Sequence, residues 1–235
     1  MPKPRVALLL GSVALLLMPL AGLGHRAGIY HFAVALSLGM TLAPLLGAAA
    51  VIIGVRALRR GGRTPIALAG IVFGLVSVAI PVYWLQRGLR APLIHDITTD
   101  VANPPTYDAI VPLRANDNPL DYDPEVGRQQ QEAYPYIVPL TLSVPPAEAF
   151  TRALATAQDL GWDIVAANQQ ASRIEAIALT YWYGFKDDVV IRLTPEGAGT
   201  RVDVRSVSRV GANDLETNAR RIRRYLTSLR ERGLN

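Results

Sequence analysis

The sequence predicts a membrane protein in two parts: an anchor of three transmembrane α-helices, followed by a soluble α+β domain built on an antiparallel sheet. Three observations predict it. The first 90 residues contain long apolar runs and neither Asp nor Glu, so all 19 acidic residues lie in residues 91–235. Residues 91–136 are rich in proline. Residues 137–235 alternate between the hydrophobic periods of strands and helices.

The apolar runs are residues 6–23, 29–55 and 65–85, and none of them contains an acidic or basic residue other than His31. About 20 apolar residues, rising about 1.5 Å each, cross the hydrocarbon core of a bilayer. All three runs are long enough, so residues 1–90 are expected to form a three-helix transmembrane region. The first run can also be read as a signal peptide, although it lacks a clean small-x-small cleavage site.

Lys and Arg residues are unevenly placed around these runs. Cytoplasmic loops carry an excess of both. The distribution therefore predicts a cytoplasmic N-terminus in a bacterial inner membrane, with the C-terminal domain in the periplasm. The side assigned to the cytoplasm has Lys3, Arg5, Arg56, Arg59, Arg60 and Arg63, and the opposite side has Arg26, Arg87 and Arg90.

The basic character belongs to the membrane part alone. Residues 1–90 have a net charge of +9, whereas residues 91–235 have a net charge of −4. A nucleic-acid-binding protein would concentrate positive charge on its folded domain, so no nucleic-acid partner is expected. The expected partners are membrane lipid, whose anionic headgroups attract flanking basic residues, and another integral membrane protein.

Small residues recur four positions apart within the second and third runs. Gly39 is followed by Ala43, and Gly70 is followed by Gly74. Such pairs let helix backbones approach closely. Two interpretations remain open: the three helices pack on one another, or the small residues form a docking face for another membrane protein.

Ten of the seventeen prolines lie in residues 91–146. Because proline breaks helices and central strands, residues 91–136 are expected to form an extended, mostly irregular segment that wraps the folded domain with its apolar side chains. His95 and Asp96, with Asp100 nearby, form a small polar group. A His beside a carboxylate can act as a general base; the alternative is a surface or capping role.

Residues 137–235 are expected to form a sheet of about five antiparallel strands with two helices packed on one face. Asn213 and Glu216 are expected to cap the last helix. In the strand at 200–208, Val202 and Val204 alternate with charged residues, which predicts one buried and one wet face. The expected strands are 137–143, 162–167, 173–179, 187–194 and 200–208, and the expected helices begin at residues 146 and 213.

Residues that commonly carry chemistry are sparse. The chain has no cysteine, which excludes a disulfide, a Cys-bound zinc ion and a thiol nucleophile. No Gly-x-Ser-x-Gly elbow, helical His pair or Gly-rich phosphate loop occurs. Asp187 and Asp188 are adjacent in a strand and therefore point to opposite faces. No cofactor, no metal and no enzymatic activity are expected.

Two surface features leave alternatives open. An aromatic group before residue 187 suits either a binding surface or a small core. An arginine face on the last helix is either solvated or in contact with anionic lipid. The aromatic group is Tyr181, Trp182, Tyr183 and Phe185, and the arginines are Arg220, Arg223, Arg224 and Arg230.

The run 202–211, VDVRSVSRVG, is followed by Asp214-Leu215, Asn218 and Arg221-Ile222. Together with HDITTD at 95–100, these residues resemble the bacterial family called domain of unknown function 1499, over residues 94–230. Val207 departs from the family pattern, which commonly has Arg there. The resemblance implies a domain without a known reaction.

The resemblance also implies a set of candidate ligand- or partner-binding residues. In one interpretation they are structural: Arg209 or Arg221 pairs with Asp214, and the serines and amide satisfy turn backbone. In the other they form an anion or headgroup pocket at a strand-to-helix corner. The candidates are His95, Asp96, Asp100, Arg192, Arg205, Ser206, Ser208, Arg209, Asp214, Asn218 and Arg221.

Three functions follow from these features. The favoured one is a non-enzymatic accessory or assembly module, whose periplasmic domain serves a membrane protein complex. The alternative is an envelope module that binds lipid or a small anion. The least favoured is a hydrolase that uses His95 and Asp96.

Overall fold

The computed structural model describes residues 3–61, 64–115 and 117–232. Arg63, one of the basic residues from which the membrane orientation is predicted, lies outside the described residues. The chain divides into two compact units. The helical unit is Met1–Arg90 with Tyr181–Gly184, and the sheet unit is Ala91–Thr180 with Phe185–Asn235.

Within the described residues, the helical unit contains three helices that are long and apolar enough to cross a membrane, as predicted: Pro4–Arg26, Phe32–Arg59 and Thr64–Arg90. The second consists of α2 (Phe32–Leu36), a π-helical turn η1 (Ser37–Leu42) and α3 (Ala43–Arg59). Pro44 gives a reason for the wide turn, because its ring has no N–H for the carbonyl of Met40 and collides with it. The others are α1 (Pro4–Arg26) and α4 (Thr64–Arg90).

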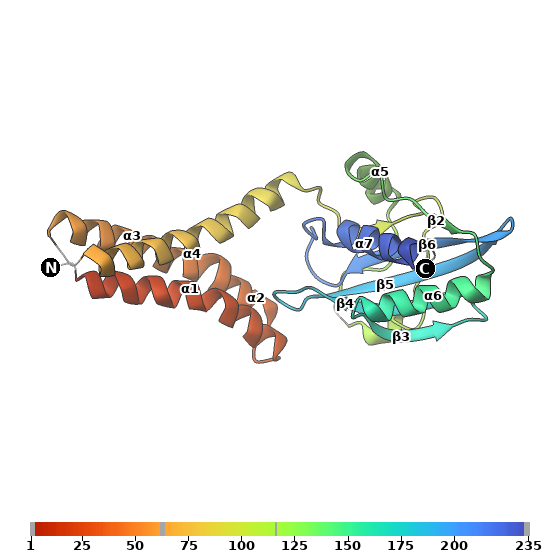
Figure 1. The fold of residues 1–235 in the computed structure, drawn as a ribbon, viewed down its shortest axis with the longest axis horizontal. Coiled ribbons are helices and arrows are strands. Elements are labelled where there is room, and N and C mark those ends of the chain that lie inside the picture. Colours follow the sequence, from red (N-terminus) through yellow and green to blue (C-terminus); the bar gives the residue numbers. More distant parts are fainter. Residues whose placement is uncertain (1–2, 62–63, 116, 233–235) are drawn as a thin grey trace. The chain divides into compact units, whose positions relative to one another are not determined.

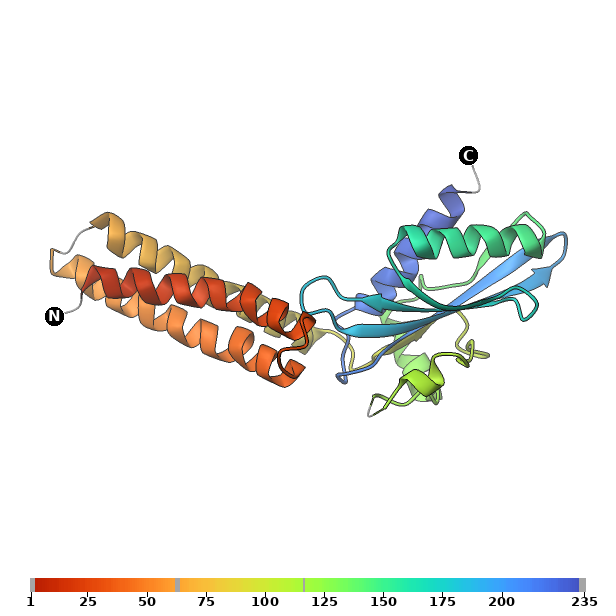
Figure 2. The same cartoon turned by 90° about the horizontal axis from the view of Figure 1, so that it is seen from below.

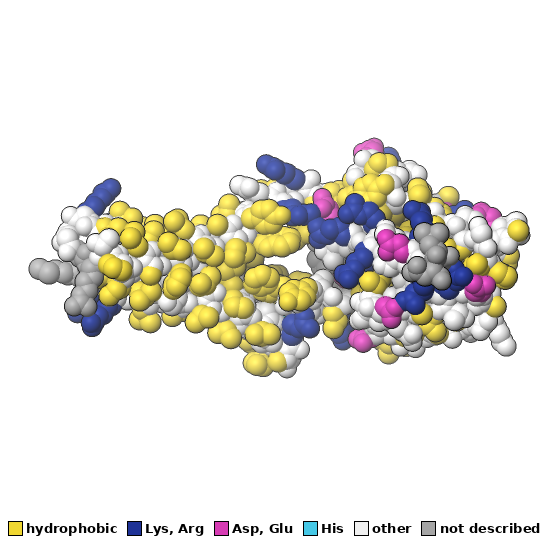
Figure 3. All heavy atoms as spheres, viewed as in Figure 1, with side chains coloured by type: hydrophobic (Ala, Val, Ile, Leu, Met, Phe, Trp, Pro, Cys, Tyr) yellow, Lys and Arg dark blue, Asp and Glu magenta, His cyan; other side chains and the backbone are white. Residues whose placement is uncertain are grey.

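The three helices pack on one another through small side chains that repeat every three or four residues. A Cβ atom added to Gly11 of α1 would lie 2.7 Å from the carbonyl oxygen of Gly70, and one added to Gly47 of α3 would lie 2.7 Å from that of Gly74. Gly39 and Ala43 are also buried, while large apolar side chains point outward (Figure 3). The buried small residues are Ala7, Gly11 and Ala14 in α1, Gly47, Ala50 and Gly54 in α3, and Ala67, Gly70, Gly74 and Ser77 in α4.

The described part of the sheet unit contains a six-stranded antiparallel sheet in the order β1-β6-β5-β4-β3, with β2 also paired with β6 (Figure 1). Because β1 and β2 both pair with β6, the chain leaves the sheet after β1 and returns to the same edge at β2. The strands are β1 (Asp96–Thr98), β2 (Leu140–Leu142), β3 (Asp163–Asn168), β4 (Arg173–Leu179), β5 (Lys186–Glu196) and β6 (Gly199–Ser208).

Helices α6 (Pro146–Asp159) and α7 (Thr217–Glu231) lie on one face of the sheet (Figure 2). Their apolar sides pack on Val189 and Ile191 of β5 in one continuous core. Tyr225 of α7 stacks on Trp162, with ring centroids 5.1 Å apart, and its hydroxyl donates to the carbonyl of Ala153 at 3.0 Å. The predicted α+β class, with two helices on one face of an antiparallel sheet, is confirmed.

The prediction that the second face of the sheet is wet was wrong. Residues 99–115 and 117–133, here called the covering segment, lie across it (Figure 2). Asp203 and Arg205 of β6 are consequently only 1% and 2% exposed. The covering segment is also less irregular than expected, because it holds a short 3₁₀ turn, η2 (Val111–Leu113), and a helix, α5 (Pro124–Ala133). Proline is tolerated at the first position of that helix, and Asp123 caps it by accepting from the N–H of Glu125 at 2.8 Å.

The start of the last helix also differs from the prediction. Leu215 and Glu216 have positive φ angles of 53° and 64°, so a helix cannot run through them, and α7 begins at Thr217. Asn213 accepts from the N–H of Leu215, at 2.6 Å, before the helix starts. The cap is instead Asp214, which accepts from the N–H groups of Glu216 and Asn218 at 3.0 and 2.7 Å.

We expect Gly70→Val to weaken the helical unit, because its Cβ atom would lie 2.7 Å from the carbonyl oxygen of Ala7. Overpacking of this kind costs about 1–3 kcal/mol. The matched control is Val72→Leu on the outward face of α4. Thermal unfolding in detergent should show a lower midpoint for Gly70→Val only; equal midpoints would contradict the packing described.

Candidate functional site

The candidate residues lie on both faces of β5 and β6, near the end at which β6 finishes. Residues that alternate along these strands are divided between the two faces. Asp187 and Ser208 are paired in register and face the helices, whereas Asp188 and Arg205 face the covering segment. The candidates therefore form separate clusters rather than one pocket.

The helix-side cluster consists of Asp187, Ser206, Ser208, Asn218 and Arg221. Asn218 accepts from the hydroxyl of Ser206 at 2.7 Å and donates to the hydroxyl of Ser208 at 2.9 Å. Arg221 forms an ion pair with Asp187 at 2.5 Å and donates to Ser206 at 3.1 Å. These contacts connect all five side chains, so the cluster fastens the first turn of α7 to β5 and β6.

Arg205 is the centre of the segment-side cluster. Its Nε and Nη2 atoms donate to the two carboxylate oxygens of Asp96 at 2.9 and 2.7 Å. Nη1 donates to the carbonyl of Pro105 at 3.2 Å, and Nη2 also donates to that of Leu120 at 2.7 Å. All three guanidinium nitrogens thus have acceptors, which a buried charge requires.

Two aromatic rings complete the surroundings of Arg205. Its guanidinium carbon lies 5.3 Å from the ring centroid of Tyr107 and 5.2 Å from that of Tyr122, both from the covering segment. These are cation–π distances. Burial raises the pKa of Tyr107 well above 10 and that of Tyr122 to about 12. Both rings are therefore neutral at physiological pH.

Asp188 is held by two arginines. Arg209 donates through Nε and Nη2 at 3.0 and 2.8 Å, and Arg114 of the covering segment also pairs with it. Arg209 additionally donates to the carbonyl of Leu113 at 3.2 Å and lies 3.6 Å from Asp117. The side chain of Arg209 therefore ties the end of β6 to the covering segment.

Arg192 and Asp100 belong to a third group, nearer the middle of β5. Arg192 donates to Asp203 at 3.0 Å and to Asp100 at 3.2 Å, and Arg201 contacts the same two carboxylates. Asp100 thereby fastens the start of the covering segment to β5 and β6.

His95 is bonded to these clusters through its backbone. Among the residues that the structure describes, the hydrogen bonds of His95 are made by its carbonyl, which accepts from Ser208 and Asn218 at 2.9 and 3.0 Å. Asp96 gives both carboxylate oxygens to Arg205. The carboxylate that was expected to act with His95 is therefore held by Arg205.

Two residues outside the predicted set, Glu175 and Gln130, bond to backbone groups of β1 and the covering segment. Glu175 is buried and accepts from the N–H groups of Asp108, Ala109 and Ile110 at 3.0–3.2 Å. Gln130 of α5 accepts from the N–H of Thr98 and donates to its carbonyl at 2.9 and 2.7 Å. A carboxylate within the apolar run of β4 was the available signal for Glu175; nothing in the sequence marked Gln130.

The arginines of these clusters are all paired with carboxylates. Arg205, Arg209, Arg221 and Arg192 each have at least one carboxylate partner. The partners of Arg209 and Arg221 are Asp188 and Asp187, in place of the expected Asp214. Within the part of the chain that the structure describes, no group of three or more His, Cys, Asp and Glu side chains is placed to hold a metal ion. An open hollow of about 680 Å³ lies at the β3–β4 turn, residues 166–170, at the opposite end of the sheet from these clusters.

A family model matches residues 96–229, from the start of β1 nearly to the end of α7. It is described as "Protein of unknown function (DUF1499)". The chain belongs to this family. No curated protein matches the chain. Among solved structures, the chain is similar to the crystal structure of TTHA0849 from Thermus thermophilus, with 15% identity and a TM-score of 0.26 over 41% of this chain and 94% of that one.

Arg205→Ala should destabilise the DUF1499 domain strongly. Removing one partner of a buried ion pair costs about 3–5 kcal/mol because the other charge is left unpaired. The matched control is Arg152→Ala on α6, whose partner Glu148 is exposed; an exposed pair contributes about 1 kcal/mol or less. Urea unfolding of the full chain in detergent measures both, and equal midpoints would rule out a structural role for Arg205.

The free energy of unfolding should depend on pH through the protonation of Asp214. Burial raises the pKa of this carboxyl from 3.8 to about 6, although the N–H groups of Asn218 and Glu216 oppose the shift. Between about pH 4 and pH 6 the folded domain keeps a proton that the unfolded chain releases, so the free energy of unfolding falls as pH rises, by up to about 3 kcal/mol.

Asp214→Asn removes this proton while keeping an oxygen for the cap. We expect the fall in stability between about pH 4 and pH 6 to be smaller in the variant than in the natural chain. Urea unfolding midpoints across this range measure the difference. Parallel curves for the two proteins would show that Asp214 does not titrate there.

Proposed function

We propose that this protein is a non-enzymatic accessory module of a membrane protein complex, and that its DUF1499 domain docks an acidic protein surface through the outer side of α7. This proposal keeps the accessory role favoured by the sequence. The proposed docking surface is not the strand-to-helix corner, because the arginines of that corner are paired with carboxylates of the same domain.

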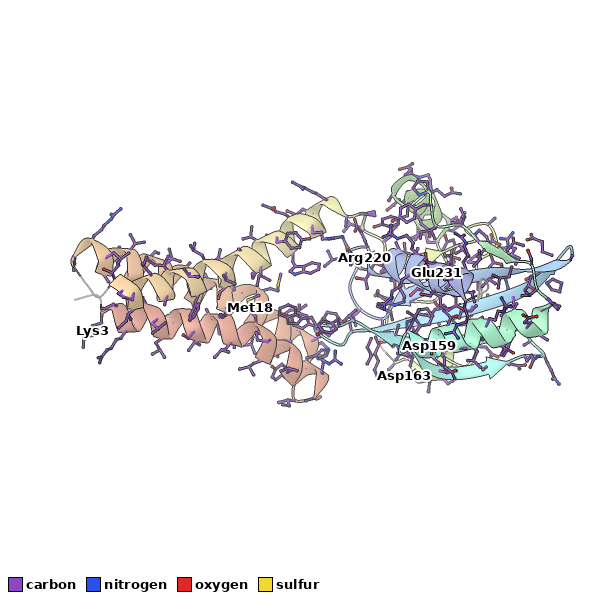
Figure 4. The ribbon with its side chains drawn as sticks, in the orientation of Figure 1. Lys3, Met18, Asp159, Asp163, Arg220 and Glu231 are labelled. Atoms are coloured by element: carbon purple, nitrogen blue, oxygen red, sulfur yellow. The ribbon has the colours of Figure 1, made fainter. Side chains whose placement is uncertain are left out.

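The observation that carries the proposal is the exposed basic side of α7. Arg223, Arg224 and Arg230 are exposed, and no carboxylate partner is found for them among the described residues. Figure 3 shows Lys and Arg side chains gathered over α7, and Figure 4 marks Arg220 near its start and Glu231 at its end. Arg220 and Arg232 differ, because they pair with Glu216 and Asp159.

Aromatic and apolar side chains adjoin these arginines. The guanidinium carbon of Arg223 lies 5.6 Å from the ring centroid of Tyr136, which is 50% exposed, and Val138, two residues further along the chain, is also exposed. Tyr and Arg supply many of the side chains that dominate binding energy in protein interfaces. Exposed arginines on one helix, with a tyrosine beside Arg223, therefore support an acidic protein partner, since charge complementarity steers association and sets specificity.

The membrane orientation is part of the same proposal. The distribution of Lys and Arg supports a cytoplasmic N-terminus and a periplasmic DUF1499 domain in a bacterial inner membrane. In that orientation the partner is a periplasmic surface of a membrane complex.

The alternative roles have less support. Binding of a lipid headgroup or small anion by Arg205 and Arg209 would require each guanidinium to leave a buried carboxylate, which is costly. Hydrolysis by His95 would require Asp96 to leave Arg205.

The test is affinity purification of the tagged full chain from native membranes in a mild detergent. The variant Arg223→Glu/Arg224→Glu should lose a protein partner that the natural chain retains. Its control, Gln169→Glu/Gln170→Glu, adds negative charge at the exposed β3–β4 turn and should retain the partner. If both variants keep the partner, the α7 surface is not the docking surface. If no stoichiometric partner is purified with the natural chain, the accessory role is refuted.

A further inference from the structure

The loop between β4 and β5 carries the aromatic group noted in the sequence, and the α7 surface does not use it. This loop, residues 180–185, has the sequence TYWYGF and is here called the aromatic loop. Tyr181 is 94% exposed and Trp182 is 42% exposed, and Leu179 at the end of β4 is exposed as well. Large apolar and aromatic side chains at one exposed tip mark an interaction surface.

The aromatic loop has a defined conformation. The N–H of Thr180 donates to the carbonyl of Phe185 at 2.9 Å, and the N–H of Phe185 donates to the hydroxyl of Thr180 at 2.8 Å. Gly184 has a φ of +71°, a conformation that other residues rarely adopt. These features close the base of the loop and hold its aromatic residues at the tip of the hairpin.

The other turns of the sheet have a different composition. The β3–β4 turn contains Gln169 and Gln170, and the β5–β6 turn contains Glu196 and Gly197. By contrast, residues 176–186 contain no acidic residue and end with exposed Lys186. Tyr and Trp with a neighbouring Lys are the residues typical of the membrane–water interface.

Chain connectivity indicates which partner the loop can reach. The aromatic loop lies at the end of the sheet at which β6 finishes and β1 starts, since Asp187 pairs with Ser208 and Asp96 with Val207. The five residues 91–95 join the end of α4 to the start of β1, and a chain that short reaches at most about 18 Å. The β3–β4 and β5–β6 turns lie at the opposite end of the sheet. The tip of the aromatic loop belongs to the helical unit, where the carbonyl of Tyr181 accepts from Nη1 of Arg26, at the end of the first membrane span, at 2.7 Å.

From these observations we infer that the aromatic loop inserts Tyr181 and the exposed part of Trp182 into the headgroup region of the lipid bilayer, beside the end of the first membrane span. The covalent link through residues 91–95 fixes one point of the sheet unit. The loop supplies another, because the chain leaves β4 of the sheet unit at Leu179 and returns to it at β5. This attachment does not depend on the α7 surface or on any protein partner.

Site-directed spin labelling tests the inference directly, because the chain has no cysteine and any introduced one is unique. The full chain would be labelled in the Tyr181→Cys and Leu179→Cys variants, with Gln169→Cys on the opposite turn as the control. Each would be placed in nanodiscs of mixed zwitterionic and anionic phospholipid. Power saturation then measures collisions with oxygen, which concentrates in lipid, and with a water-soluble nickel complex.

We expect the oxygen-to-nickel collision ratio at position 181 to exceed that at position 169 several-fold, and the ratio at 179 to lie between them. A ratio at 181 equal to that at 169 would show a loop in water and overturn the inference. Low collision rates with both reagents at 181 would overturn it too, because they would show that protein rather than lipid covers the loop.

Discussion

The sheet unit depends on the contact between Arg205 and Asp96 more than on any other interaction. Its two hydrogen bonds join β6 to β1, and the remaining donors of Arg205 hold the carbonyls of Pro105 and Leu120 from the covering segment. A guanidinium in an apolar interior is stable only when its donors are satisfied. The covering segment can close over the sheet because it supplies those acceptors, and Arg205 can be buried because the segment closes.

The same constraint explains why polar side chains dominate both faces of one end of the sheet. Short strands and proline-rich chain offer few backbone hydrogen bonds, since proline has no N–H. Carboxylates and amides replace them: Glu175 accepts three backbone N–H groups, and Gln130 bonds to both backbone groups of Thr98. The covering segment is therefore attached by side chains rather than by a ladder of backbone bonds.

This mode of attachment also sets how far the sequence could predict the structure. The apolar spans and β4 were predictable because periodicity and length determine them locally. The partners of Arg205 and Arg209 were not, because Asp96 is 109 residues from Arg205 and no local pattern records such a pairing. For the same reason, alternating charges in β6 suggested a wet face, when they form buried pairs under a distant segment. The start of α7 was missed because Asn213, Asp214 and Glu216 all suit a cap, and only the backbone conformation of Leu215 and Glu216 selects among them.

A dense set of Arg, Ser, Asn and Asp in a short stretch is typical of binding sites, yet here its members satisfy one another. Two surfaces of the described residues outside these clusters carry the side chains typical of interaction sites: the side of α7 and the aromatic loop. α7 begins at the end of the sheet that carries the loop, since Asn218 bonds to Ser206 and Ser208, and it rises about 1.5 Å per residue from there. The arginines at 223, 224 and 230 therefore follow one another along α7 away from that end of the sheet. A row of exposed arginines along one helix is complementary to an acidic protein surface, whereas Tyr and Trp at the tip of a loop suit lipid headgroups, so the two surfaces serve different contacts.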